Sequence, residues 1–232
     1  MINLVQVMAL AAVLCLTGGP AYAQGAGIEW ETLIEEVRTL YRAGRYDRAA
    51  TVAKKALEVA EKRVGLNHPD VATSLSNLAK SHQAQGQYDQ SEPLYKRALD
   101  IVEKTFGPDD PAVANSLGNL ADFYREQGQY AQAEPLIRRA LAIREKALGS
   151  DHPAVAQSLN NLAVVYLAQE QYAQAEPLLK RALVIREKAL GPNHPDVATV
   201  LKNLAQLYRA TKRIAEAEQL EERAAKIKAN NK

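Results

Sequence analysis

The sequence repeats itself with a period of 42 residues. The segment Asn-His-Pro-Asp-Val-Ala-Thr begins at Asn67 and again at Asn193, and related segments begin at Asp109 and Asp151. Residues 109–149 and 151–191 agree at 30 of 41 positions without a gap. A period of about 20–50 residues is typical of solenoids, in which a unit that cannot bury its apolar face alone packs that face against the next unit.

Each unit contains two stretches with helical periodicity. In the unit that begins at Asp109, apolar residues recur three and four positions apart over residues 113–124, and a second run of this kind covers residues 130–143. The runs stop near Gly128 and Gly149, and glycine commonly ends helices. We therefore predict that each unit is a helical hairpin and that the chain is an all-α solenoid of about five stacked hairpins.

The end units depart from the repeat pattern. We expect the solenoid to span residues 28–228, with repeats at about 28–66, 67–108, 109–150, 151–192 and 193–228 and a tail at 229–232. In the last unit, Lys212 replaces the turn glycine, and Gln219 and Glu221 replace apolar residues. These polar groups are expected to face water, as terminal units of a stack require.

The first 23 residues differ from the rest of the chain. They contain no charged side chain, and the apolar run from Leu4 to Leu16 is too short to span a bilayer comfortably. Ala21-Tyr22-Ala23 has the small-x-small pattern that signal peptidase recognises. We expect a signal peptide at 1–23, a short linker at 24–27 and a protein outside the cytoplasm, without stable membrane insertion after cleavage. Retention of the segment as an anchor is the alternative. Cys15, the sole cysteine, lies inside it.

The recurrent His-Pro pair allows two interpretations. A proline at the first helical position is well tolerated because its missing N–H would be unpaired there. The residue before each proline is then the N-cap, with Asp110 a good cap and the histidines weaker ones. As ligands of one metal, His68, His152 and His194 would each have to lie within about 2 Å of it. Equivalent positions in stacked hairpins are on the order of 10 Å apart. We therefore interpret the motif as a structural joint, and we expect His82, alone in a column of tyrosines, to be a core residue.

The repeat resembles a known family. Its pattern, Leu-x-Asn-Leu-Ala-x-x-Tyr followed by Gly-x-Tyr-x-x-Ala-Glu-Pro-Leu-x-x-Arg-Ala-Leu, is similar to the tetratricopeptide repeat. The 42-residue period and the His-Pro-Asp-Val-Ala joint are similar to the kinesin light chain subtype. The resemblance covers about residues 28–228. It implies a right-handed α-solenoid with a concave groove, and a chain with a secretion signal resembles a periplasmic or secreted bacterial member rather than a motor adaptor.

Composition and motifs argue against several classes of function. The net charge is only +2 and aromatic residues make up 6% of the chain, which gives no support to nucleic-acid binding. The sequence contains no Gly-rich phosphate loop, no His-Glu-x-x-His and no Gly-x-Ser-x-Gly. We therefore expect a protein that is not an enzyme and has no catalytic residue, metal site or cofactor. The charged groups around Arg144 and Arg186 are expected to form a solvated face.

The resemblance implies that the side of each first helix turned away from the core lines the groove. An asparagine recurs there in four units, and its amide can both donate to and accept from a peptide backbone. The other positions vary between units, as a surface with different tasks along its length would. The candidate groove residues are Asn77, Lys80, Asn119, Asp122, Arg125, Asn160, Asn161, Val164, Leu167, Lys202, Asn203 and Arg209.

These features favour a non-enzymatic scaffold or adaptor that binds an extended peptide segment of another protein in the groove. Val164 and Leu167 predict an apolar residue near the centre of that segment, and Arg125 and Arg209 predict acidic residues around it. A self-associating structural array and a platform within an enzyme complex are the alternatives. The asparagines would be structural instead if they bridged neighbouring helices.

Overall fold

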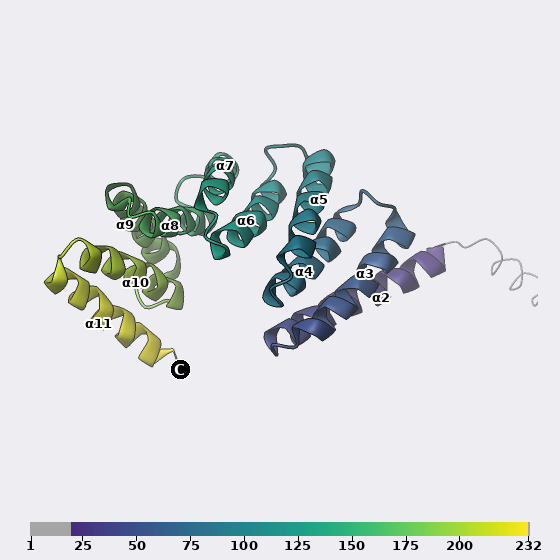
Figure 1. Cartoon of the computed structure of the whole chain (residues 1–232), viewed down its shortest axis with the longest axis horizontal. Coiled ribbons are helices and arrows are strands. Elements are labelled where there is room, and N and C mark those ends of the chain that lie inside the picture. The colour runs from purple at the N-terminus through teal and green to yellow at the C-terminus, as the bar shows by residue number, and fades with distance from the viewer. Residues whose placement is uncertain (1–19, 232) are drawn as a thin grey trace, which may run out of the picture. The chain divides into compact units, whose positions relative to one another are not determined.

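The computed structural model describes residues 20–231, with side chains from Gly27 onward. Over this range the chain forms helices joined by short turns, and it contains no strand (Figure 1). It divides into two compact units, each of which contains more than one repeat; the first ends at Thr105 and the second begins at Phe106. From here on, "unit" refers to these two bodies and "pair" to one repeat. Each unit is a series of helix-turn-helix pairs, which confirms the predicted all-α fold.

Every pair has a first helix and a second helix. Corresponding helices start 42 residues apart, except that the first helix of the first pair begins further toward the N-terminus. The first unit contains α2 (Pro20–Arg42), α3 (Tyr46–Val64), α4 (Pro69–Ala84) and α5 (Tyr88–Phe106). The second unit contains α6 (Pro111–Glu126), α7 (Tyr130–Leu148), α8 (Pro153–Ala168), α9 (Tyr172–Leu190), α10 (Pro195–Ala210) and α11 (Ile214–Asn230). The first helices also approach one another within a unit, α2 to α4 and α8 to α10. Such first-helix neighbours share one face of the unit.

A left-handed residue closes the turn inside each pair. Gly86 and Gly128 adopt φ values of 74° and 72° there. The two later pairs place Glu170 (φ 60°) and Lys212 (φ 63°) at the same repeat position. A side chain with a Cβ is strained in this conformation, whereas glycine is not. The turn geometry is therefore kept even where the sequence no longer favours it.

The His-Pro segments are helix caps, as predicted. Nδ1 of His152 accepts a hydrogen bond from the backbone N–H of Ala154 at 3.1 Å, and Pro153 occupies the first helical position. His68 and His194 accept from the second residue after them in the same way, and Asp110 does so with its carboxylate at 2.8 Å. The imidazoles thus satisfy one of the N–H groups that a helix start leaves unpaired.

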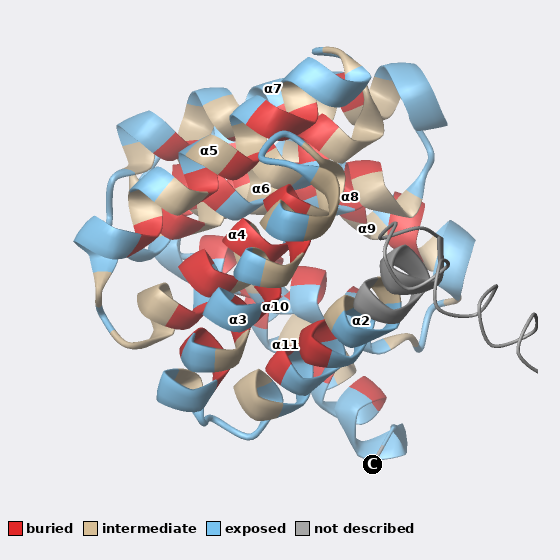
Figure 2. Ribbon diagram, turned by 90° about the vertical axis from the view of Figure 1, so that its right-hand side faces the viewer, coloured by how far each residue is buried: buried red, intermediate tan, exposed pale blue. Residues whose placement is uncertain are grey.

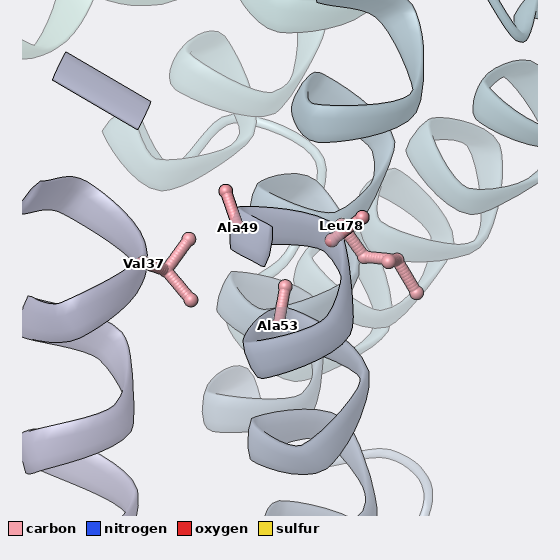
Figure 3. Packing of buried hydrophobic residues seen from close by; sticks show 5 residues of the cluster. Val37, Ala49, Ala53 and Leu78 are labelled. Atoms are coloured by element: carbon pink, nitrogen blue, oxygen red, sulfur yellow. The ribbon is translucent and has the colours of Figure 1, made fainter. Parts of the chain in front are cut away.

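Buried residues form stripes on the sides of the helices that face their neighbours (Figure 2). In the first unit, Val37 of α2, Ala49 and Ala53 of α3, and Leu78 of α4 pack together (Figure 3). One alanine column is buried in every pair, at Ala56, Ala98, Ala140, Ala182 and Ala224. Because alanine is small, the helices can approach closely at these points, and a larger residue would overpack them.

The N-terminal boundary differs from the expectation. Residues 24–27, predicted to be a linker, are helical because α2 already begins at Pro20. The glycines in this stretch favour a linker, but each costs a helix only about 1 kcal/mol. Extending an existing helix requires no new nucleation step, so this cost does not prevent the helix from including them. Residues 1–19, including Cys15 and most of the predicted signal peptide, lie outside the described residues.

Candidate functional site

In the first unit, the two first helices enclose a cleft. A cavity of about 280 Å³ lies between them, and we call it the α2–α4 cleft. It is lined by Val37, Arg38, Tyr41, Arg42, Asn77 and Lys80. Two predicted groove residues, Asn77 and Lys80, therefore share a hollow with four α2 residues that the sequence analysis did not include. Arg38 could have been found, because it stands one 42-residue period before Lys80.

The α2–α4 cleft carries an excess of positive charge. The Lys80 ammonium lies 4.8 Å from the centroid of the Tyr41 ring, within cation–π range. Arg38 pairs with Glu35 at 3.2 Å, but both side chains are more than half exposed, so water screens the pair. Arg42 forms no ion pair with any residue between 27 and 231. The cleft can therefore accept an anionic group.

The predicted groove residues of α6 include an exposed asparagine beside a cluster of charged groups. Asn119 is exposed, and among the described residues its side chain has no hydrogen-bond partner. Arg125 lies 3.3 Å from the Asp122 carboxylate and 3.9 Å from that of Glu126. The Arg125 charge is therefore balanced locally, whereas the Asn119 amide is exposed and can contact a ligand.

In α8, two of the predicted contact residues are buried. Asn160 is 5% exposed, and its side-chain oxygen accepts a hydrogen bond from Asn203 of α10 at 2.8 Å. Leu167 is 8% exposed and packs within the unit. Asn161 and Val164 are half-buried, and Asn161 accepts from Gln157 at 2.8 Å. The Asn160–Asn203 pair bridges α8 and α10, which is the structural role considered above as the alternative for the asparagines. Because Leu167 is buried, it is not part of the surface offered to a ligand.

In α10, the predicted basic residues have different surroundings. Arg209 forms two hydrogen bonds to the Glu221 carboxylate of α11, at 2.7 and 2.6 Å. This contact lowers the pKa of Glu221 and raises that of Arg209. Lys202 is exposed, and the neighbouring Lys228 lowers its pKa. Arg209 is therefore already paired, whereas Lys202 is part of a cationic spot that it forms with Lys228.

Arg144 and Arg186, expected on a solvated face, instead connect helices. Arg186 is 3% exposed and donates to the Asp196 carbonyl of α10 at 2.7 Å and to Gln157 Oε1 of α8 at 2.6 Å. Arg144 donates to Ser158 of α8 at 2.6 Å and to Asn115 of α6 at 3.0 Å. Burial lowers the pKa of both guanidinium groups. Their long side chains reach between hairpins, which the pattern of one helix could not reveal.

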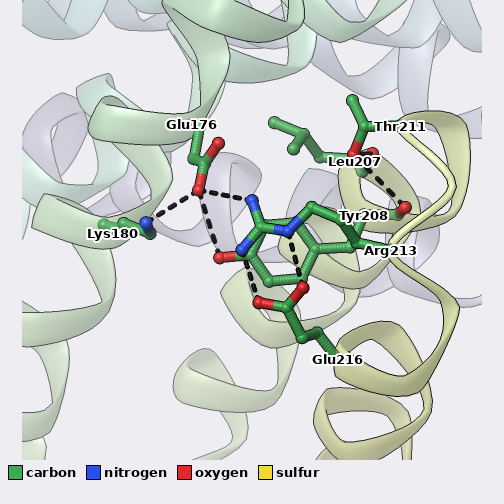
Figure 4. A network of polar contacts seen from close by, with 7 residues as sticks. All are labelled: Glu176, Lys180, Leu207, Tyr208, Thr211, Arg213 and Glu216. Carbon is green, nitrogen blue, oxygen red and sulfur yellow. Dashed lines mark hydrogen bonds and ion pairs between the residues drawn. The ribbon is translucent and has the colours of Figure 1, made fainter.

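A second contact between hairpins joins the glutamate of the Ala-Glu-Pro-Leu segment to a tyrosine of the next first helix. The Tyr166 hydroxyl donates to Glu134 at 2.9 Å, and Tyr208 is placed in the same way 3.3 Å from Glu176 (Figure 4). Lys180 and Arg213 also bond Glu176 and lower the pKa of that carboxyl to about 2. This contact was not predicted from the sequence, although the glutamate and the tyrosine both recur at the 42-residue period.

The polar side chains described above mainly form contacts between neighbouring helices. Among residues 27–231, no three His, Cys, Asp or Glu side chains are grouped so that they could hold a metal ion. Of the helices that the structure describes, none combines the length and apolar character needed to cross a membrane. The polar networks connect neighbouring helices, and the α2–α4 cleft is a hollow lined by exposed cationic side chains.

The fold is similar to those of several solved structures. A structure from Podosopora anserina, described as a kinesin light chain with nearly identical TPR-like repeats, is 28% identical, with a TM-score of 0.73 over 88% of this chain and 97% of that one. BtubC (BKLC) from P. vanneervenii is 26% identical, with a TM-score of 0.75 over 90% and 85% of the two chains. PilF of Pseudomonas aeruginosa, at 21% identity and a TM-score of 0.64 over 87% and 78%, shares the fold. No curated protein matches the sequence.

The sequence also matches a family model, that of the tetratricopeptide repeat, at residues 37–103, 70–136, 113–188 and 158–230. These overlapping matches run from the last turns of α2 to the end of α11. Proteins of this kind generally mediate protein–protein interactions and are typically non-enzymatic scaffolds. The repeated hairpins, their 42-residue period and these matches together show that the chain belongs to the tetratricopeptide repeat family.

Proposed function

We propose that this protein is a non-enzymatic scaffold that binds an extended, acidic segment of a partner protein across the first helices of its first unit. The observation that carries the proposal is the α2–α4 cleft, where Arg38, Arg42 and Lys80 surround Tyr41 and Asn77. A hollow of this composition offers hydrogen bonds, a ring face and positive charge within one contact surface.

Each group of the cleft has a distinct task in this proposal. The half-buried Asn77 amide can both donate and accept, so it can pair with a peptide bond whatever the ligand's side chains are. Arg42 presents a planar guanidinium that matches a carboxylate in two-point contact. A peptide backbone at Asn77 would therefore carry an Asp or Glu side chain toward Arg42.

The proposed ligand differs from the one suggested by the sequence. Leu167 is buried, so an apolar residue at the centre of the ligand has no matching surface there. Arg125 and Arg209 are paired with neighbouring carboxylates, so they exert little pull on acidic residues. In this proposal the ligand carries an acidic residue that binds at the α2–α4 cleft. This replaces the apolar centre at Leu167 and the acidic residues near Arg125 and Arg209. Because the charges of the α2–α4 cleft are exposed, binding should weaken as the salt concentration increases.

The N-terminal sequence places the partner outside the cytoplasm in this proposal. Ala21-Tyr22-Ala23 resembles a signal-peptidase site. A bacterial periplasmic or secreted chain would meet its partners there, and the described part of this chain has no cysteine that could mispair. Fractionation of the native cells, followed by detection of the protein in each fraction, tests the location directly.

The binding proposal is tested by selection and calorimetry. A display library of random peptides is screened against the full chain, and a selected peptide is titrated into the protein and into Asn77→Ala and Arg42→Ala variants. Each substitution should weaken binding by about 1–3 kcal/mol, because it leaves a peptide group or a carboxylate without its partner. Lys62→Ala is the matched control, since Lys62 is an exposed cation on α3.

Two results would contradict the proposal. One is a selection that yields no enrichment of acidic residues. The other is an affinity that falls in Lys62→Ala but stays unchanged in both cleft variants. Analytical ultracentrifugation of the same samples addresses the alternative of self-association, because an array that buries the cleft would exclude the peptide as protein concentration rises.

A further inference from the structure

A second cavity lies on a different side of α4, against the second helices α3 and α5. Its volume is about 660 Å³, within the range of about 300–1,000 Å³ typical of small-molecule sites. Ala50, Lys54 and Leu57 line it from α3, Leu78 and His82 from α4, and Leu94 from α5. We call it the α3–α5 pocket. It is separate from the α2–α4 cleft and shares no lining residue with it.

The repeat shows what fills the corresponding place in the second unit. Two periods after Ala50, Lys54 and His82 stand Glu134, Arg138 and Tyr166. Glu134 pairs with Arg138 at 2.8 Å and accepts the Tyr166 hydroxyl at 2.9 Å. The Tyr166 ring is 2% exposed. A carboxylate, a cation and a phenol ring therefore close this part of the second unit.

The next repeat contains the same three groups. Glu176 pairs with Lys180 at 2.7 Å, and the Tyr208 hydroxyl lies 3.3 Å from the same carboxylate (Figure 4). In α5 of the first unit, Glu92 and Lys96 also form this pair, at 2.6 Å. The glutamate four residues before a cation is thus a regular feature of α5, α7 and α9.

The α3–α5 pocket departs from this pattern at two of its three positions. Ala50 supplies no carboxylate, so Lys54 forms no ion pair with any of the described residues. His82 has a shorter ring than tyrosine, and its Nδ1 is turned to Gln87 Oε1, 2.5 Å away. His82 is half-buried rather than the core residue that the sequence predicted. What remains is a cation beside leucine side chains where the other repeats have a ring and a carboxylate.

We propose that the α3–α5 pocket binds a small aryl carboxylate. The ring of the ligand packs on the partly buried Leu57 and Leu94, and its carboxylate pairs with Lys54. Asp47 lines the pocket seven residues before Lys54, about 10 Å along α3, and selects against a second carboxylate at that end. A para-hydroxyl at that end can instead donate to the Asp47 carboxylate. The ligand class is therefore a monocarboxylate with a neutral or phenolic ring.

Titration of the full chain with 3-(4-hydroxyphenyl)propionate tests the proposal. Binding is measured by calorimetry and by chemical-shift changes at the pocket residues. The neutral isostere 3-(4-hydroxyphenyl)propanamide should bind at least about tenfold more weakly because it cannot pair with Lys54. Lys54→Gln should weaken binding of the acid by a similar factor and leave binding of the amide unchanged. Lys62→Gln, an exposed α3 control, should change neither.

The repeat itself supplies the decisive variant. Ala50→Glu combined with His82→Tyr rebuilds the Glu–Lys–Tyr group of the other repeats, so it should abolish binding of the acid while the melting temperature stays equal or rises. The proposal is overturned if the wild-type chain does not bind the acid at millimolar concentration. It is also overturned if the acid and the amide bind equally, or if the rebuilt variant binds as well as the wild type. Should the double variant fail to fold, Lys54→Gln and the acid–amide comparison still decide the matter.

Discussion

Replacing Arg186 with alanine should destabilise the second unit substantially. Arg186 is 3% exposed, and its guanidinium donates to the Asp196 carbonyl at 2.7 Å and to Gln157 Oε1 at 2.6 Å. Two hydrogen bonds from a charged donor contribute about 3–6 kcal/mol together. Removing the side chain also removes the cost of burying a charge, which is the reason for the lowered pKa of Arg186. We expect a net loss of about 2–3 kcal/mol in the free energy of unfolding.

The matched control is Lys188→Ala, two residues further along α9. Lys188 pairs with Asp151 at 2.7 Å, but both side chains are well exposed and water screens the pair, so its loss should destabilise the protein far less than the loss of Arg186. Arg186→Met should recover part of the loss, because an apolar side chain of similar length fills the space without a buried charge. Urea unfolding followed by circular dichroism, with the slope compared between variants, measures all three. If Arg186→Ala and Lys188→Ala unfold at the same urea concentration, Arg186 is solvated and our reasoning is wrong.

Four further outcomes are expected. Leu162→Ala should cost about 2–5 kcal/mol because Leu162 is fully buried, whereas His152→Ala should cost at most about 1 kcal/mol as a lost cap; equal urea midpoints would contradict this. Lys212→Gly should stabilise the chain by about 1 kcal/mol because it relieves a positive φ, visible as a raised melting temperature. The folded-state pKa of the Glu176 carboxyl is about 2, against an ordinary 4.5. Its contribution to the free energy of unfolding is therefore complete above pH 4.5 and is lost as the pH falls toward 2. Glu176→Gln should flatten the pH dependence of stability over that interval, and parallel acid-unfolding curves for the two proteins would refute this. N-terminal sequencing of the native protein should find Gln24 first, and an intact Met1 would exclude cleavage.

Much of the secondary structure could be predicted because its determinants are local. Proline at the first helical position and the capping residue before it fix the start of α4, α6, α8 and α10. The spacing of apolar residues decides which side of each helix is buried, and Leu120 and Leu162 on those sides are buried. The 42-residue period extends these local signals to the whole array. Where the local signal is weak, as at residues 24–27, the sequence did not indicate the helix that the structure has there.

The candidate site was harder to predict because it depends on how hairpins stack. Asn160 and Asn161 are adjacent in the sequence, yet one is buried against Asn203 and the other is half-buried, because α10 packs over one side of α8 only. Arg38 enters the α2–α4 cleft only because α2 lies beside α4. No single helix contains that information.

Residues within a few turns of one another are enough to predict the all-α class, the caps and the apolar stripes, and the 42-residue period is visible in the sequence directly. The stacking of the hairpins is needed to see that Arg144 and Arg186 join them, that Leu167 is buried, and that the first unit has two separate hollows. The physical reason is that a long polar side chain can either extend into water or reach a partner on the next hairpin. The distance between stacked helices, rather than the spacing of residues along one helix, determines which of these occurs.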